Sequence, residues 1–206
     1  MRYHEIIEAP LPDDWDKRMF DRSTPFKKMV AYAKERAKQV GRGSSRVAFE
    51  VPYQGRKTVI KVALNGKGLA QNREEARLLS DGHIANIGIA IPLIDYDKEN
   101  GDNPTWIHTE FANKIDQTSL NRYFGVPNLW HVTRYLDKLT GRTKKSPDVP
   151  PEVEENPYFQ KLKDLVITYD LPAGDFYRKA NWGMYNGKPV IIDMGYTSEV
   201  QKLYHK

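Results

Sequence analysis

A glycine-rich turn, set between segments that alternate apolar and polar residues, constrains the fold of this chain more than any other feature. Gly41 and Gly43 stand one residue apart, and the residues after them alternate. Gln54-Gly55 offers a tight turn, and segment 58–63 returns with a second β-type pattern. Period-two segments joined by a two-residue turn predict an antiparallel hairpin. We therefore expect an antiparallel sheet here, with Lys61 on its second long strand aimed at the glycine-rich turn.

The residues of that turn suit a phosphate. Glycines let backbone N–H groups approach an anion closely, and Ser44 and Ser45 keep the tip of the turn small and polar. A lysine on the facing strand adds a positive charge. The alternative is a surface hairpin with one solvated lysine, and short glycine motifs by themselves do not separate the two interpretations.

A helix is predicted directly after the lysine strand. Apolar residues recur at helical spacing over 69–79, which places Glu75 on the inward side and leaves Glu74 solvated. A carboxylate in the position of Glu75 can hold the ammonium of Lys61 in place. This pairing favours the phosphate interpretation of the hairpin.

A second hairpin is predicted near the C-terminal end. Asn186-Gly187 is a strong two-residue turn signal, and it pairs position 181 with 192 and position 180 with 193. Asn181 and Asp193 then lie side by side, and a carboxylate next to an amide oxygen is suited to Mg²⁺. The alternative is that Asp193 simply caps a turn.

In this order, the glycine-rich turn, the strand lysine, the helix glutamate, Asn181 and the Asp193-Met-Gly motif resemble the protein-kinase family. The resemblance covers about residues 38–197 and is nearest to small, divergent kinase-like proteins encoded by bacteriophages. It implies an α+β, two-lobed protein-kinase-like fold with an antiparallel-sheet N-lobe and a reduced, mostly helical C-lobe. It also implies ATP and Mg²⁺ as cofactors.

The resemblance assigns roles to individual residues. Lys61 would bind the α- and β-phosphates and pair with Glu75, while Asn181 and Asp193 would hold Mg²⁺. The residues expected to contact the phosphates from the turn are Gly41, Gly43, Ser44 and Ser45.

The segment 106–112 is expected to be the last N-lobe strand and the hinge. Glu110 and Ala112 would offer backbone groups to adenine, and Thr109 would lie at the back of the pocket. This assignment rests on position in the chain more than on a motif.

The chain departs from the family pattern at the catalytic loop. Ala173-Gly174-Asp175 stands where the family has His-Arg-Asp, and Asp175 is our candidate for the catalytic base. Asp170 is the rival, although it lies farther from Asn181 than the family loop allows. Arg46 replaces the third glycine, and its side chain either adds charge near the phosphates or points to water.

We expect one kinase-like domain over 1–206, with an N-terminal arm and helix over 1–40, an N-lobe and hinge over 41–112, and a truncated C-lobe over 113–206. Because the chain ends soon after Asp193, the usual activation segment is expected to be absent.

Within this domain the arm would dock by Trp15 and Phe20 or stay loose. Helices are predicted over 119–139 and 158–169, with an exposed, proline-rich loop at 140–157. The residues of the first of these helices expected in the core are Trp130, Tyr135 and Leu139.

Composition narrows the class of protein. The 206 residues include no cysteine, so disulfides and thiolate metal sites are excluded. The formal net charge of +5 comes from scattered lysines and arginines without a nucleic-acid-binding signature, which makes nucleic acid an unlikely partner. No apolar run is long enough to cross a bilayer, and we expect a cytoplasmic protein, in the host cytoplasm if it is phage-encoded.

These observations predict an ATP-dependent phosphotransferase that moves the γ-phosphoryl group of Mg-ATP to a hydroxyl. The acceptor is expected to be a protein serine or threonine, with a host protein as a candidate substrate. The alternatives are a pseudokinase that acts by nucleotide-gated docking to a partner, a small-molecule kinase, and a basic nucleic-acid-binding protein.

Overall fold

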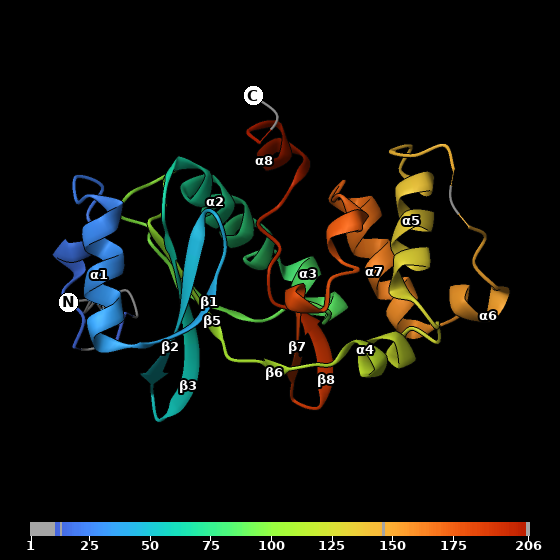
Figure 1. The fold of residues 1–206 in the computed structure, drawn as a ribbon, viewed down its shortest axis with the longest axis horizontal. Helices are drawn as coiled ribbons and strands as arrows, with labels where there is room; N and C mark the ends of the chain where they lie inside the picture. The colour runs from blue at the N-terminus through green and yellow to red at the C-terminus, as the bar shows by residue number, and fades with distance from the viewer. Residues whose placement is uncertain (1–10, 13, 146, 205–206) are drawn as a thin grey trace, which may run out of the picture. The chain divides into compact units, whose positions relative to one another are not determined.

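The computed structural model describes residues 11–12, 14–145 and 147–204, which form two compact units (Figure 1). The first unit contains the chain up to Ala76 together with Leu93–Glu110. The second contains Arg77–Pro92 and the chain from Phe111 onward. The chain thus leaves the first unit for the last time close to the predicted lobe boundary after residue 112. The segment Arg77–Pro92, which was expected in the N-lobe, belongs to the second unit.

The first unit is built on a five-stranded sheet in which every neighbouring pair is antiparallel. The strand order is β1-β2-β3-β5-β4. The strands are β1 (Lys38–Arg42), β2 (Arg46–Tyr53), β3 (Arg56–Ala63), β4 (Leu93–Tyr96) and β5 (Trp106–Glu110).

The predicted hairpin between β2 and β3 is confirmed. Tyr53 pairs with Arg56, so Gln54 and Gly55 form a two-residue turn, with φ of 49° and 75°. Positive φ at both turn positions matches the right-handed twist of the strands that they connect. The register aligns Gly41, Ala48, Lys61 and Ile107 across four strands, so that the lysine shares a row with the first glycine.

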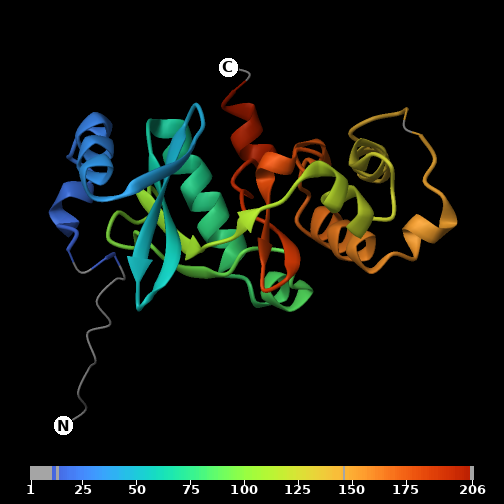
Figure 2. The same cartoon turned by 60° about the horizontal axis from the view of Figure 1, so that its bottom comes forward.

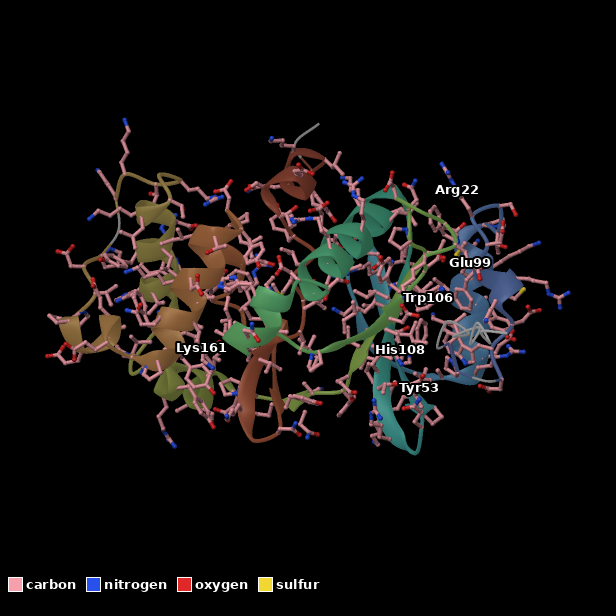
Figure 3. The ribbon with its side chains drawn as sticks, turned by 180° about the vertical axis from the view of Figure 1, so that it is seen from behind. Arg22, Tyr53, Glu99, Trp106, His108 and Lys161 are labelled. Atoms are coloured by element: carbon pink, nitrogen blue, oxygen red, sulfur yellow. The ribbon has the colours of Figure 1, made fainter. Side chains whose placement is uncertain are left out.

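One face of this sheet forms a hydrophobic core with α1 (Phe26–Arg36) and η1 (Lys17–Phe20). Trp15 and Phe20 are buried and stacked with ring centroids 5.4 Å apart, so these residues of the arm dock, which is one of the two alternatives that the sequence left open. Residues 1–10 and 13 of the arm lie outside the described residues. Figure 3 shows Trp106, His108 and Tyr53 along the same side of the sheet.

The helix α2 (Gly66–Leu79) follows β3 closely. A Cβ atom at Gly68 would lie 2.1 Å from the carbonyl oxygen of Ser45 and 3.1 Å from Cα of Ala63. Only glycine permits so close an approach between backbones. The first turn of α2 therefore lies directly against the chain that leads into β2.

The second unit is mostly helical (Figure 2). Its only sheet among the described residues has three strands in the order β6-β7-β8, and the chain at Ala90 forms a parallel bridge to Ile191. The strands are β6 (Asn113–Lys114), β7 (Trp182–Tyr185) and β8 (Lys188–Ile191). The helices are α3 (Gly82–Ile87), α4 (Gln117–Tyr123), α5 (Leu129–Leu139), α6 (Pro151–Glu154), α7 (Pro157–Thr168), η2 (Ala173–Asp175), η3 (Lys179–Asn181) and α8 (Ser198–Lys202).

The single helix predicted over 119–139 is wrong, because the chain forms α4 and α5 with a break between them. Gly125 adopts a φ of 66°, and the nearby Pro127 cannot donate a helical hydrogen bond. Trp130 and Leu139 are 40% and 45% exposed, so their predicted place in the core is also wrong. The buried side of α5 is formed instead by Leu129, Val132 and Leu136.

Two further predictions can be compared with the second unit. The helix expected over 158–169 is confirmed as α7. The stretch 140–157, expected as an exposed loop, contains α6 and buries Val149 and Val153. Within the described residues, each helix is too short or too polar to cross a membrane. The predicted fold class is confirmed: the chain is α+β, with an antiparallel sheet in one unit and mainly helices in the other.

We expect Gly68→Ala to destabilise the protein by about 1–3 kcal/mol, the cost of inserting an atom into packed structure. The matched control is Gly66→Ala in the same helical turn, where a Cβ meets nothing within 4 Å. That control is expected to be neutral or stabilising by up to about 1 kcal/mol because alanine favours helices. Urea unfolding midpoints measure both, and equal stability of the two variants would contradict the close backbone approach at Gly68.

Candidate active site

The predicted pairing of Lys61 with Glu75 is present. Nζ of Lys61 lies 2.5 Å from Oε1 of Glu75. The lysine side chain is 10% exposed and the carboxylate is completely buried. Because Lys61 stands on β3 and Glu75 on α2, this ion pair joins the helix to the sheet.

The structure answers the question that the sequence left open about Arg46. Its side chain is buried, so it does not point to water. Nη1 of Arg46 lies 2.5 Å from Oε2 of Glu75 and 3.3 Å from Oδ1 of Asn72. Asn72 in turn donates to the carbonyl oxygen of Pro104 at 3.0 Å. Glu75 therefore holds Lys61 with one carboxylate oxygen and Arg46 with the other.

The prediction that Glu74 is solvated is wrong. The residue is 4% exposed, and its Oε1 lies 3.2 Å from Nε of Arg73. Helical periodicity placed it next to the inward face of α2. In the folded chain the side of α2 that carries Glu74 is also buried.

The glycine-rich turn is tighter than expected. Gly41 lies inside β1, opposite Ala48, and the turn itself starts at Gly43, whose N–H donates to the carbonyl of Arg46 at 2.9 Å. The hydroxyl of Ser45 is buried and donates to Gln71 on α2 at 2.7 Å. The carbonyl of Ser44 accepts from Asn65 at 3.0 Å. The phosphate-contacting roles of these residues stay predictions.

The residues expected at the hinge lie at the division between the units. Glu110 is the last residue of β5, where its backbone pairs with Thr58. The guanidinium of Arg56 donates hydrogen bonds of 2.7–3.1 Å to its carboxylate. In the second unit, a Cβ atom at Gly183 would lie 2.5 Å from Cβ of Ala112, so β7 passes directly beside that residue. That Glu110 and Ala112 bind adenine is still a prediction.

The predicted neighbourhood of Asn181 and Asp193 is confirmed by the register of the β7–β8 hairpin. Trp182 pairs with Ile191, and the N–H of Ile192 donates to the carbonyl of Asn181 at 2.8 Å. Asp193 is the residue directly after Ile192, so the hairpin brings it next to Asn181. Both Asn181 and Asp193 are half-buried.

Asp175 belongs to the same cluster. Nδ2 of Asn181 donates to the backbone carbonyl of Asp175 at 2.9 Å, which leaves Oδ1 as the asparagine atom with the chemistry of a metal ligand. Burial raises the pKa of the Asp175 carboxyl, and the negative charge of Asp193 raises it further. Arg178 and Asn181 act in the opposite direction.

Asp170, the rival candidate for the base, lies in a different environment. Its side chain is 75% exposed and lies 2.5 Å from Nη2 of Arg142. Its φ of 50° fits the turn that ends α7. The structure thus places Asp175, and not Asp170, next to Asn181.

The donor set of this cluster suits a hard cation. Asp193 offers a carboxylate and Asn181 an amide oxygen, and Mg²⁺ takes a few such oxygens together with phosphate oxygens. The described part of the chain contains no cluster of three or more His, Cys, Asp or Glu side chains able to hold a metal on their own.

Sequence reasoning missed one residue near the cluster, Asp137 on α5. It is buried and its Oδ1 accepts the N–H of Ala173 at 3.0 Å. One feature of the sequence could have identified it: Asp137 is an acidic residue in the last turn of a helix, where cations are preferred.

No protein-family model matches the chain, and no curated protein matches it. Among solved structures, aminoglycoside phosphotransferase APH(4)-Ia matches with 12% identity over 78% of this chain and 66% of its own, at a TM-score of 0.36. A thermostable mutant of that enzyme, in a ternary complex with AMP-PNP and hygromycin B, matches with 13% identity over the same shares, at a TM-score of 0.35. The chain thus spans slightly less than two thirds of these relatives. At such scores the likeness gives no residue-by-residue correspondence, and residue roles rest on this chain's own geometry.

The expectation of a protein substrate is corrected by these matches. The matched proteins are named as aminoglycoside phosphotransferases, and one of the structures is a ternary complex with AMP-PNP and hygromycin B. A protein acceptor is therefore not retained. That the chain is encoded by a bacteriophage stays a prediction.

We expect Glu75→Gln to destabilise the protein by about 3–5 kcal/mol, because two buried cations lose the carboxylate that they share. Adding Arg46→Met to that variant removes one of the cations and is expected to recover part of the loss. The coupling energy from a double-mutant cycle in urea measures the interaction. Arg56→Met, which removes the half-exposed partner of Glu110, is the control and is expected to cost at most about 1 kcal/mol. Additive effects of Glu75→Gln and Arg46→Met would contradict the shared carboxylate.

We expect Asp175→Asn to raise the melting temperature at pH 7 without added metal, in EDTA. The raised pKa of Asp175 means that its ionised form is less favourable in the folded chain than in the unfolded chain. Its contribution to stability is full below the unfolded pKa of about 3.9 and is lost as the pH rises through the folded value. The difference in melting temperature between Asp175→Asn and wild type should therefore increase as the pH rises from about 4 to 7. Asp170→Asn is the control and should not stabilise, and a stabilisation of both variants alike would refute this account.

Proposed function

We propose that the chain is an ATP-dependent phosphotransferase whose acceptor is the hydroxyl of a small molecule. The observation that carries this proposal is the cluster of Asp175, Asn181 and Asp193, in which two carboxylates and an amide are held by one hairpin and one loop. Such a cluster offers a proton acceptor and two metal ligands that the fold brings close together. Phosphoryl transfer requires those groups and little other side-chain chemistry.

The first unit supplies the features that suit a nucleotide. Glu75 holds the ammonium of Lys61, which would bind the α- and β-phosphates, and the register places Gly41 in the same cross-strand row. Backbone N–H groups of a glycine-rich turn bind phosphate oxygens. Arg46 restrains the carboxylate from its other side, so the lysine is pre-organised before a ligand arrives.

In the second unit, Asn181 and Asp193 would hold Mg²⁺. When bound, the metal offsets the negative charge of the phosphates. Nδ2 of Asn181 already donates to the backbone of Asp175, which fixes the side-chain amide with its oxygen as the remaining ligand atom. Asp193 lies two residues after β8 and directly follows Ile192, whose N–H donates to the carbonyl of Asn181 at 2.8 Å.

Asp175 would orient the acceptor hydroxyl and take its proton. The hydroxyl oxygen forms a bond to the γ-phosphorus, the bond from that phosphorus to the β–γ bridging oxygen breaks, and ADP leaves with the electron pair. Burial and Asp193 raise the pKa of Asp175, which makes it a stronger base than a solvated aspartate. Its backbone, held by Asn181, keeps that base in place.

We expect radiolabelled phosphate to pass from ATP to a small molecule when the protein is incubated with Mg²⁺ and an acceptor. The acceptors to be tried are a panel of polyhydroxyl compounds, hygromycin B among them, and the low-molecular-weight fraction of a cell lysate. Asp175→Asn should lower the rate by about 10²–10⁴-fold, the usual contribution of a general base, while ATP binding by calorimetry is retained. Asp170→Asn is the matched control and should keep the wild-type rate.

Two outcomes would overturn this function. If wild type binds ATP but transfers no label to any acceptor, a pseudokinase that docks to a partner replaces the phosphotransferase. If label appears on proteins of the whole lysate and not on small molecules, the acceptor class is wrong. Loss of transfer in Asp170→Asn but not in Asp175→Asn would show that Asp170, and not Asp175, is the catalytic base.

A further inference from the structure

The loop that carries Asp175 is held by three side chains that bind its backbone. Asp137 accepts the N–H of Ala173 at 3.0 Å, Asn181 donates to the carbonyl of Asp175 at 2.9 Å, and the indole of Trp182 donates to the carbonyl of Phe176 at 2.7 Å. Asn181 and Trp182 follow the loop in sequence. Asp137 comes from α5, far earlier in the chain, and is the only one of the three that bears a charge.

The carboxylate of Asp137 lies against two successive residues of this loop. Its Oδ1 accepts the N–H of Ala173. A Cβ atom at Gly174 would lie 3.4 Å from Oδ2 of Asp137, so the carboxylate fills the space beside that glycine. The missing side chain at Gly174 therefore leaves room for the carboxylate to reach the backbone of the loop.

The position of Asp137 is unfavourable for stability alone. A buried carboxylate must be compensated by hydrogen bonds, and an anion in the last turn of a helix opposes the helix dipole. Burial raises the pKa of Asp137, against the effects of Ala173, Arg134 and Arg142. An apolar residue would complete the buried side of α5 at lower cost. The carboxylate is explained by what it holds and not by the packing of its own helix.

The support for Asp137 is rigid. Asn128 caps the start of α5 by accepting the N–H of Trp130, and Leu129, Val132 and Leu136 bury one side of the helix. The carbonyl of Asp137 also accepts the N–H groups of Arg142 and Thr143, which fixes the chain that leaves the helix. The carboxylate is therefore presented to the loop from a fixed frame.

We propose that Asp137 is a positioning residue: it fixes the backbone of the loop at Ala173 and thereby sets where the side chain of Asp175 points. The part of this inference that concerns Asp175 rests on the proposed function. Asp137 itself touches no reacting atom. Its role is to keep the base from moving while the acceptor hydroxyl is bound.

The test compares Asp137→Ala, Asp137→Asn and wild type by two measurements. The first is amide hydrogen exchange of residues 173–176, which needs neither ATP nor acceptor. The second is the transfer rate per molecule that binds ATP, with the binding stoichiometry from calorimetry. Asp137→Asn preserves the shape of the side chain and one acceptor oxygen, so the test can still be made if the alanine variant folds poorly. Asp148→Asn, a side chain that is 97% exposed, is the control for loss of one negative charge.

We expect exchange of the Ala173 amide to rise by at least about tenfold in Asp137→Ala, with a smaller rise in Asp137→Asn. The rate per ATP-binding molecule should fall by about 10–100-fold in the same order, while KM for ATP stays within about twofold. Asp148→Asn should change neither measurement. A purely structural role would instead lower the binding stoichiometry and leave the rate per binding molecule unchanged.

The inference is overturned if exchange of the Ala173 amide does not change, or if it rises while the rate per ATP-binding molecule stays at the wild-type value. Failure of the proposed function is read from wild type alone, as an absence of transfer to every acceptor. In that case the part of the inference that concerns Asp175 falls with it, and the exchange measurement shows separately whether Asp137 holds the loop.

Discussion

The first unit depends on the buried carboxylate of Glu75. Its two oxygens lie 2.5 Å from Lys61 on β3 and from Arg46 at the start of β2, so one side chain of α2 joins the helix to two adjacent strands. Charges buried in this way are costly to desolvate and are tolerated only with close partners. The glycine at position 68 lets the first turn of α2 approach the chain before β2, which brings the carboxylate within reach. The placement of Lys61 is thus a consequence of helix packing as much as of its strand.

In the second unit, the site cluster of Asp175, Asn181 and Asp193 is held by hydrogen bonds. Burial raises the pKa of Asp175, and the negative charge of Asp193 raises it further, so the ionised carboxylate is unfavourable where it stands. Neutral hydrogen bonds from Asn181 and Trp182, together with the charged bond from Ala173 to Asp137, fix the backbone around it. Strain of this kind is typical of sites that must present charge to a ligand.

Local patterns predicted the parts of the site that depend on strand register. Two-residue turns at Gln54-Gly55 and Asn186-Gly187 set both hairpins, and register alone then aligned Lys61 with Gly41 and brought Asp193 beside Asn181. The errors fall where burial depends on distant segments. Trp130, Leu139 and Glu74 were misplaced because a helical pattern identifies an inward side only approximately, and the neighbours that cover a helix come from elsewhere in the chain.

By itself, the sequence determined the α+β class, the two hairpins, and the order in which lysine, glutamate, asparagine and aspartate follow one another. Those features follow from period-two and period-3.6 patterns and from turn residues, all of which act over a few neighbours. Only the tertiary structure decided that Arg46 shares Glu75 with Lys61, that Asp175 and not Asp170 adjoins Asn181, and that Asp137 holds the loop. Each of these pairs residues from separate elements, and such contacts form because burial leaves polar groups no solvent and forces them to find partners across the fold.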